Sequence, residues 1–247
     1  MKFFYQSGTM GFDGKGYSWH YWMNYRFPKF PTISKTVTFH PKSGHPLWIV
    51  PYGDSVWNKV GLHNSGLAHW LNNYYNEGIV LSIAVENAYL CIDAYYSILY
   101  SKPLAGIELN MSCPNVSHED DIYEITDHYI DKMQDLKSKG HIGSLYLKVG
   151  ASHNLNYFYK LPYVDRIHIN SVPKKIGAVS GRAAKKANWV FIERWQGLHG
   201  IPEIAGASWS SLEDIKSLKG MGCKTIGIGS AILTNPCLVE RLTEYEE

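Results

Sequence analysis

The sequence predicts an α/β protein of the (β/α)8, or TIM, barrel class, and the main observation is a regular alternation of segment types. Short apolar segments typical of strands alternate with helix-like stretches along all 247 residues. Several of these segments are nearly continuous apolar runs, as in parallel strands that are covered on both faces. No linker, repeat or low-complexity tract interrupts the alternation, so a single domain over residues 1–247 is expected.

Eight segments are expected to be the strands of this barrel, because apolar residues dominate them. They are Phe3–Gln6, Thr32–Thr38, Ile79–Val85, Ile107–Met111, Leu145–Val149, Arg166–Asn170, Glu203–Gly206 and Thr225–Gly229. An open, doubly wound sheet is the alternative arrangement. The absence of a GxGxxG motif after the first strand disfavours it.

The strongest helical pattern is Asp121–Lys139, which Gly140 is expected to end. Its apolar residues recur at spacings of three and four: Ile122, Ile125, Tyr129, Met133 and Leu136. Further helices are expected at Leu67–Tyr75 and Asn87–Tyr100, and weaker helical patterns occur at Gly16–Phe27 and Ser180–Trp195.

Two local patterns predict where the last helices begin. Ser210 and Glu213 have the spacing of a capping box. Asn235 followed by Pro236 suits the N-cap and first turn of a closing helix that runs through Tyr245.

Charge and composition exclude several classes of protein. The net charge is +2 and there is no run of Lys or Arg, so the sequence predicts no nucleic-acid partner. No stretch has the roughly 20 consecutive apolar residues of a membrane span, and the first residues do not resemble a signal peptide. The four cysteines have no CxxC or metal-type spacing, so we expect reduced thiols, no metal site and a cytoplasmic protein.

Chemistry-bearing residues gather where the expected strands end, and the carboxyl ends of the strands form the active face of such a barrel. The stretch Ile107–Asn115 runs from a buried strand into amides, a hydroxyl and the Cys113 thiol. Lys148 lies in an otherwise apolar strand, where a buried ammonium needs a partner. The glycine-rich turn Gly227–Ser230 suits a phosphate, because backbone N–H groups can approach it closely.

Seven short motifs occur in order along the chain: Gln6–Phe12, Ser34–Thr38 with Pro41–Pro46, Asn58–Asn64, Asn110–Asn115, Ile169–Ser171, Gly177–Gly181 and Gly227–Ala231. With these motifs the sequence resembles the dihydroorotate dehydrogenase family of FMN-dependent (β/α)8 barrels over almost the whole chain. It is more similar to the soluble, cysteine-using class of that family than to the membrane-bound class.

The resemblance implies oxidation of dihydroorotate to orotate in pyrimidine biosynthesis, with hydride transfer to the flavin N5. It implies that Cys113 is the base and that Lys148 and Lys35 assist the reaction beside the flavin. The implied substrate-binding residues are Asn58, Gly61, Leu62, Asn110, Asn115, Asn170 and Ser171. The implied FMN-binding residues are Ser7, Gly8, Lys35, Thr36, Asn110, Lys148, Gly181, Ala207, Ser208, Gly229 and Ser230. A homodimer is also implied, whereas fumarate and NAD both remain open as the electron acceptor.

The sequence departs from the family pattern at one phosphate turn. Relatives usually carry Gly-Gly-Ile after strand seven, where this chain has Gly206-Ala207-Ser208-Trp209. The chain is also short for the family, and the segment between strands six and seven looks trimmed.

Two other functions compete with dihydroorotate oxidation. Dihydrouridine synthases carry a similar Asn-Met-x-Cys-Pro turn, but they usually have Gly where this chain has Ser112, and they need RNA contacts. The second alternative is a non-catalytic flavin-binding barrel, which the change at Ala207 and Ser208 motivates. The combination of Cys113 with two lysines and several asparagines argues against it, because a scaffold needs none of them.

Overall fold

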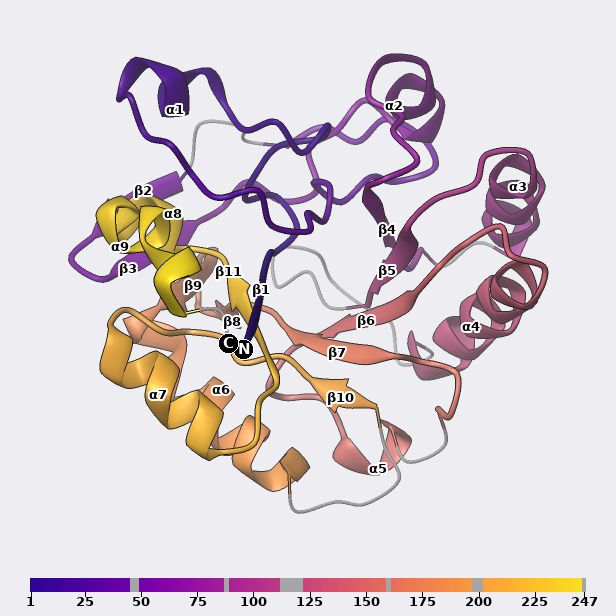
Figure 1. Cartoon of the computed structure of the whole chain (residues 1–247). Helices are drawn as coiled ribbons and strands as arrows, with labels where there is room; N and C mark the ends of the chain where they lie inside the picture. Colours follow the sequence, from indigo (N-terminus) through magenta and orange to yellow (C-terminus); the bar gives the residue numbers. More distant parts are fainter. Residues whose placement is uncertain (45–48, 87–88, 112–121, 159–160, 197–201, 246–247) are drawn as a thin grey trace.

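The computed structural model describes residues 1–44, 49–86, 89–111, 122–158, 161–196 and 202–245 (Figure 1). Parallel strands form its centre, and most helices lie outside them. One parallel sheet has the order β10-β7-β6-β5-β4. Its strands are β4 (Val80–Ala84), β5 (Gly106–Asn110), β6 (Leu145–Val149), β7 (Arg166–Ile169) and β10 (Glu203–Ile204). A parallel pair, β1 (Lys2–Tyr5) with β11 (Thr225–Ile228), lies beside it. The predicted α/β class and parallel sheet are confirmed.

Single parallel bridges connect the pair to the larger sheet. Tyr5 bridges Thr32, Ile33 bridges Val80, and on the other side Gly206 bridges Ile226. The extended segment at residues 32–37 therefore lies between β1 and β4.

The expected strand Thr32–Thr38 does not form a regular ladder, so that prediction is wrong in detail. The backbone N–H of Lys35 donates to the carbonyl of Gly11 over 2.7 Å, and the N–H of Ser82 donates to the hydroxyl of Ser34 over 3.0 Å. A turn and a side chain thus take hydrogen bonds that a strand ladder would use. The other seven expected strands are present, with ends shifted by a residue or two.

The sequence did not predict a second, antiparallel sheet of order β2-β3-β9-β8. Its strands are β2 (Ile49–Tyr52), β3 (Ser55–Asn58), β8 (Val172–Pro173) and β9 (Ala178–Gly181). All four residues of β2 are exposed, and both β2 and β8 contain a proline, so neither has the apolar alternation of a buried strand. This sheet joins the segment after residue 48 to the start of the helix that follows β9.

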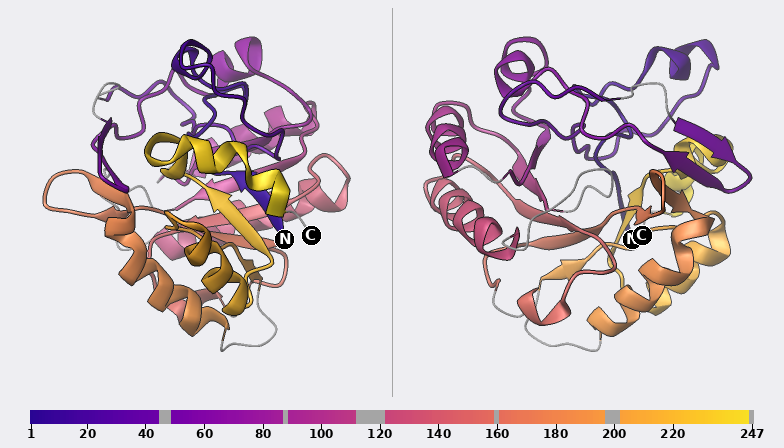
Figure 2. Two further views of the ribbon diagram at one scale, coloured as in Figure 1. Left: turned by 60° about the vertical axis from the view of Figure 1, so that its left-hand side comes forward. Right: turned by 180° about the vertical axis from the view of Figure 1, so that it is seen from behind.

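Helices cover the outer faces of the strands (Figure 2). They are α1 (Ser18–Trp22), α2 (Leu67–Asn73), α3 (Tyr89–Tyr100), α4 (Ile122–Ser138), α5 (Leu155–Phe158), α6 (Arg182–Gln196), α7 (Leu212–Gly220), α8 (Ala231–Thr234) and α9 (Pro236–Glu240), followed by a 3-10 turn at Leu242–Tyr245. The helices predicted with the strongest patterns are present, and Gly140 has the left-handed φ of 78° that ends α4.

Two predictions about helix starts need correction. The N-cap of α7 is Ser211, whose hydroxyl accepts the N–H of Asp214, and not Ser210. Pro236 does open α9, but the Asn235 side chain donates to the carbonyl of Ser210 over 3.3 Å instead of capping. The closing helix ends at Glu240 and not at Tyr245.

Buried side chains lie on both faces of the strands. The larger cluster packs strand residues such as Ile107 and Leu147 against helix residues such as Tyr129. A smaller cluster contains Phe4, Ile33, Val80 and Ala205, which come from strands or extended segments alone. The second cluster therefore lies on the face of the strands that the helices do not cover, and polar side chains follow it toward the carboxyl ends.

Candidate functional site

Lys148 of β6 contacts the turn that follows β1. It lies on the face of β6 opposite to the helix-facing Leu147, and it is half-buried. Its Nζ donates a hydrogen bond of 2.5 Å to the hydroxyl of Ser7, which follows β1. Two residues predicted to bind the cofactor, 141 positions apart, are thus brought together at the carboxyl ends of their strands.

Thr36, Ser82 and Asn110 form a buried chain of hydrogen bonds that ends at the carboxylate of Glu108. Asn110 Nδ2 donates to Thr36 Oγ1 over 3.0 Å, and Thr36 and Ser82 share a bond of 2.8 Å. Ser82 Oγ donates to Glu108 Oε1 over 2.8 Å. Because an ionised carboxylate can only accept, Ser82 must donate to Glu108 and Thr36 must donate to Ser82. The direction of every hydrogen bond in this chain is therefore fixed.

Glu108 also accepts a hydrogen bond of 2.7 Å at Oε2 from Nδ1 of His168, and both side chains are 1% exposed. Burial alone would raise the pKa of Glu108, but the His168 hydrogen bond, the charge of Lys148 and the Ser82 hydroxyl together lower it. Burial lowers the pKa of His168 by more than the adjacent carboxylate raises it. The pair is therefore a carboxylate and a neutral imidazole at neutral pH.

Aromatic rings hold the His168 imidazole in place. Its centroid lies 4.6 Å from that of Phe4 in a stacked arrangement and 4.9 Å from that of Tyr146. His168 Nε2 is buried and has no hydrogen-bond partner among the described residues. The prediction from sequence missed Glu108, His168 and Ser82, although Glu108 carries the same signal as Lys148, a charge inside an apolar strand.

Lys35 lies beside the turn that follows β1. Its backbone N–H donates to Gly11, and its Nζ lies 5.1 Å from the centroid of the Phe12 ring. Burial lowers the pKa of the Lys35 ammonium. The Phe12 ring stabilises the ammonium and offsets part of the cost of burying it.

A small polar cavity lies at the carboxyl ends of β7 and β11. Seven of the residues that line it were predicted at the site: Asn170, Ser171, Gly181, Ala207, Ser208, Gly229 and Ser230. The lining also includes Gln6, Ile169, Ser180, Trp209, Gly227 and Ala231. These lining residues come from segments that lie far apart in the sequence. The fold therefore brings the predicted phosphate-binding turns together around this cavity.

Neighbouring atoms crowd the glycines around this cavity. The Gln6 side chain could move away from a Cβ at Gly227 or Gly229, but the Asp54 carbonyl beside Gly181 is backbone and could not. A Cβ at Gly227 would lie 2.6 Å from Gln6 Nε2, and one at Gly229 would lie 2.5 Å from Gln6 Oε1. At Gly181, which has a φ of +70°, a Cβ would collide with the carbonyl of Asp54. Gln6 Nε2 is buried without a hydrogen-bond partner among the described residues, so a donor is left for an anion in the cavity.

Ser208 has the backbone conformation of a glycine. Its φ is +59°, in the left-handed region that few non-glycine residues adopt. The Ser208 hydroxyl accepts a hydrogen bond of 2.8 Å from Asn188 Nδ2, and Asn188 also donates to the carbonyl of Asn170. The turn thus has a glycine-type backbone at a residue that is not glycine.

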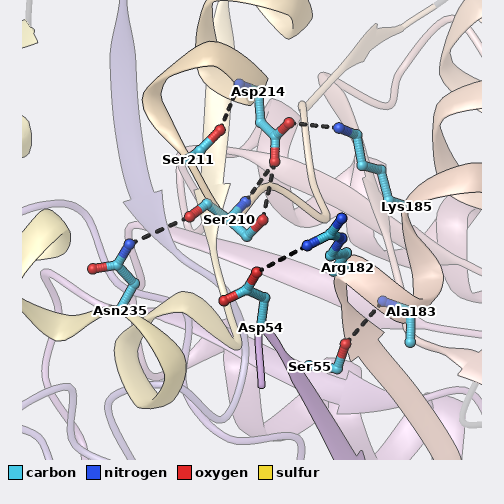
Figure 3. Close-up of polar contacts among 9 residues, drawn as sticks. All are labelled: Asp54, Ser55, Arg182, Ala183, Lys185, Ser210, Ser211, Asp214 and Asn235. Atoms are coloured by element: carbon cyan, nitrogen blue, oxygen red, sulfur yellow. Dashed lines mark hydrogen bonds and ion pairs between the residues drawn. The ribbon is translucent and has the colours of Figure 1, made fainter. Parts of the chain in front are cut away.

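Ion pairs and hydrogen bonds fix the elements behind the cavity (Figure 3). Asp214 accepts from Lys185 Nζ over 2.5 Å, from the backbone N–H of Ser210 over 2.8 Å and from its hydroxyl over 3.2 Å. Burial alone would raise the pKa of Asp214, but the Lys185 and Ser210 contacts lower it. These contacts tie the start of α6 to the start of α7.

A second set of contacts in Figure 3 fixes α6 to β3. Ser55 Oγ accepts the backbone N–H of Ala183 over 3.0 Å, and Arg182 pairs with Asp54 over 3.5 Å. The antiparallel sheet therefore sets the position of Gly181, which immediately precedes α6.

Several predicted residues are not joined to this arrangement by the contacts described. Asn58 ends β3, and its side chain accepts the N–H of Val60 over 3.2 Å. Gly61 and Leu62 follow in the loop. Cys113 and Asn115 lie outside the described residues, so the base and one substrate-binding residue stay predictions.

Parallel strands with two lysines and a row of small-residue turns at their carboxyl ends place this chain among the α/β proteins with a parallel sheet. No protein-family model matches the chain. Among curated proteins, it is 24% identical over 266 aligned positions to the catalytic subunit of dihydroorotate dehydrogenase B (NAD(+)) from Listeria monocytogenes, covering 96% of this chain and 85% of the relative. It is 25% identical over 236 positions to the proteins of that name from Thermotoga petrophila and Thermotoga maritima, covering 86% of each chain.

These similarities, at low identity but over most of the chain, support a relationship to the dihydroorotate dehydrogenase family. The names of the relatives indicate an oxidoreductase. Among solved structures, a xylanase–α-amylase inhibitor protein in complex with trehalose matches with a TM-score of 0.48 and 10% identity, over 84% of this chain and 87% of that one. A likeness of that size defines neither fold nor function. Within the described ranges, every helix is too short or too polar to traverse a lipid bilayer.

Proposed function

We propose that this protein is an FMN-dependent oxidoreductase that oxidises dihydroorotate to orotate, built as a single (β/α)8 barrel over residues 1–247. The observation that carries the proposal is the convergence of predicted residues on one edge of the strands. Lys148 meets Ser7 there, and the predicted phosphate turns line one cavity beside them. The curated relatives support the same activity independently.

The barrel is supported by the order of the parallel connections. The ladders and single bridges run from β11 to β1, through residues 32–37 to β4, and then through β5, β6, β7 and β10 back to Ile226 of β11. This is a ring of eight positions in which every connection is parallel, as in a (β/α)8 barrel. The cluster of Phe4, Ile33, Val80 and Ala205 is the side-chain layer expected inside such a ring.

The cavity fits the phosphate group of FMN. Glycines at 181, 227 and 229 leave the backbone accessible. The serine hydroxyls and Gln6 Nε2, which has no partner among the described residues, supply donors. Lys148 and Lys35 add positive charge beside the turn after β1. An anionic cofactor therefore finds donors and cations on the strand ends that the resemblance assigns to it.

The oxidation of dihydroorotate removes a proton from C5 and a hydride from C6. Bound FMN supplies the acceptor of that hydride. We assign the base to Cys113, because a thiol with an ordinary pKa near 8.5 can take and return a proton close to neutral pH. Asn110 and Asn170, with Asn58 and Asn115, would hold the pyrimidine edge, since amides both donate and accept. Lys148 supplies positive charge where reduction adds negative charge.

A cytoplasmic homodimer is part of this proposal. The relatives are named catalytic subunits of an NAD(+)-dependent enzyme, which favours NAD over fumarate as the final acceptor, reached through a second subunit.

The test is to purify the protein, identify any bound flavin, and add dihydroorotate without oxygen. We expect a yellow protein whose flavin bleaches with dihydroorotate. Bleaching should slow by at least about 100-fold in Cys113→Ser, within the range that general base catalysis contributes. Cys237→Ser is the matched control, because Cys237 is exposed on α9. It should bleach like the wild type.

Two other outcomes would replace the proposal. A flavin that stays oxidised with dihydroorotate, but is reduced by NADPH and reoxidised by uridine-containing RNA, would indicate a dihydrouridine synthase. A protein that binds no flavin after reconstitution with FMN would indicate a non-catalytic barrel.

A further inference from the structure

The hydrogen bond between Glu108 and His168 passes beneath Lys148. Glu108 lies on β5 and His168 on β7, and β6 separates these strands in the sheet. In the parallel register Lys148 is the neighbour of both Asn110 and His168. Glu108 is two positions before Asn110, so it faces the same side as Asn110 and Lys148. The bond of 2.7 Å therefore spans β6 on the face that carries Lys148.

Glu108 is held there as an anion by more contacts than packing requires. Ser82 and His168 each donate to one of its two oxygens, and the Lys148 charge stabilises it further. A buried carboxylate is costly unless it is paired, and apolar residues of similar volume would pack this position equally well. The carboxylate of Glu108 is instead retained on the face of the sheet that also carries Lys148.

We propose that Glu108 is a positioning residue and counter-charge for Lys148, and that it sets the redox potential of the bound flavin through that lysine. The second part rests on the proposed function. Lys148 favours the negative charge that reduction places on the flavin, and the nearby carboxylate opposes it. Glu108 thus keeps the potential lower than Lys148 alone would make it, which favours release of electrons to the next acceptor.

The first experiment measures the flavin midpoint potential in Glu108→Gln. A glutamine keeps the shape and removes the charge. It accepts from His168 and donates to Ser82, so the Ser82 hydroxyl must turn its own proton toward Thr36. We expect the ratio of reduced to oxidised flavin at a fixed potential to rise at least tenfold, an upward shift of about 30 mV for a two-electron couple. Glu203→Gln is the matched control, because Glu203 lies at the amino end of β10 and accepts from Thr225. Its potential should match the wild type.

His168→Gln separates charge from structure. This variant disturbs the bridge but leaves the carboxylate. A counter-charge predicts a shift less than a third as large, in fold-change, as that of Glu108→Gln. An equal shift in both variants would show that the bridge acts only by holding the backbone, and the proposal would be wrong.

A second experiment uses flavin-free protein, so that it does not depend on the proposed function. Lysines are labelled with an amine-acylating reagent and the sites are quantified by mass spectrometry. In Glu108→Gln the Lys148 amine should react at least threefold faster than in the wild type, because its ammonium has lost its counter-charge. The exposed Lys186 and Lys216 serve as internal references. An unchanged rate at Lys148 would overturn the counter-charge itself.

A double-mutant cycle covers the case in which Glu108→Gln does not fold. A charge pair predicts that Glu108→Gln with Lys148→Met is more stable than the sum of the two single changes, and that it folds where Glu108→Gln fails. Strict additivity would contradict the pairing.

Discussion

Beneath Lys148 the space between the strands is filled by hydrogen-bonded side chains, whereas around Gly181 and Ser230 it is left to backbone and small residues. In the filled region, Glu108 and His168 are almost completely buried and are bonded to each other. In the hollow region, glycines and serines line a cavity. Both regions lie toward the carboxyl ends of the strands. A hydrogen-bonded network stabilises the filled region, whereas small residues and backbone form the hollow region.

The difference shows how each region responds to change. A buried polar network is stable only when each member has its partner, so losing one donor leaves another group unsatisfied. A hollow built from small residues tolerates the loss of a hydroxyl that has no partner better than the addition of a methyl group. In the filled region, substitutions that remove a hydrogen-bond partner should therefore destabilise the fold most. In the hollow region, substitutions that add volume should do so.

The largest effect is expected for Gly181→Ala in the hollow region. The new Cβ would collide with the Asp54 carbonyl and would force a side chain into a φ of +70°. We expect a loss of about 2–5 kcal/mol in the free energy of unfolding, from overpacking plus the left-handed conformation. Urea denaturation measures it. Gly61→Ala is the control, since its φ is +69° and no atom lies within 4 Å of the added Cβ. A loss in Gly61→Ala as large as that in Gly181→Ala would mean that crowding does not distinguish the hollow region.

The next effect is expected for His168→Phe in the filled region. A phenyl ring can keep the contacts with Phe4 and Tyr146, but it cannot donate to Glu108. We expect a loss of about 2–3 kcal/mol, because a hydrogen bond to a charged, buried group disappears. His69→Phe changes an exposed histidine and should be close to neutral. If His168→Phe were equally neutral, the filled region would depend on packing alone.

The filled region should also make stability fall in acid. The pKa of His168 is lowered from 6.5 by burial, and the pKa of Glu108 is lowered from 4.5 by its donors and Lys148 despite burial. In both cases the unfolded chain binds more protons, so stability is present above the unfolded pKa and is lost as the pH falls. We expect the loss to begin below about pH 6.5, with a slope of up to about 1.4 kcal/mol per pH unit for one proton. Urea midpoints from about pH 8 to about pH 5 measure it, because they cover the baseline above about pH 6.5 and the loss below it. His168→Phe should flatten this range, and an unchanged slope would assign the acid sensitivity elsewhere.

The sequence predicted the hollow region better than the filled one, for a physical reason. Turns that approach a ligand need glycine and small polar residues, and these leave a local pattern such as Gly227–Ser230. The Glu108–His168 bond depends on the register of two strands that are not neighbours, which no local pattern reveals. Lys148 was identified because its charge interrupts an apolar strand, and the same rule applied to Glu108 would have found half of the bridge.

The antiparallel sheet escaped prediction for a similar reason. Ser55–Asn58 pairs with Ala178–Gly181, more than 100 residues away, and β2 has no buried face. Seven of the eight predicted strands have buried apolar faces that are legible locally. The eighth, at residues 32–38, is extended but pairs through a turn and a side chain, and apolar content alone cannot show that.

Ser208 has a strained backbone and a hydroxyl that accepts a hydrogen bond. Its variants can therefore separate the energetic cost of strain from the cost of a lost hydrogen bond. Ser208→Ala keeps the φ of +59° and removes the acceptor for Asn188, so we expect a loss of about 1 kcal/mol. Ser208→Gly removes the same acceptor but relieves the left-handed conformation, which costs other residues about 1–2 kcal/mol. The glycine variant should therefore be more stable than the alanine variant by at least about 1 kcal/mol, and close to the wild type. Urea denaturation of the three proteins measures the difference. Equal losses in both variants would mean that the turn is held by the hydroxyl alone, and that the serine carries no strain.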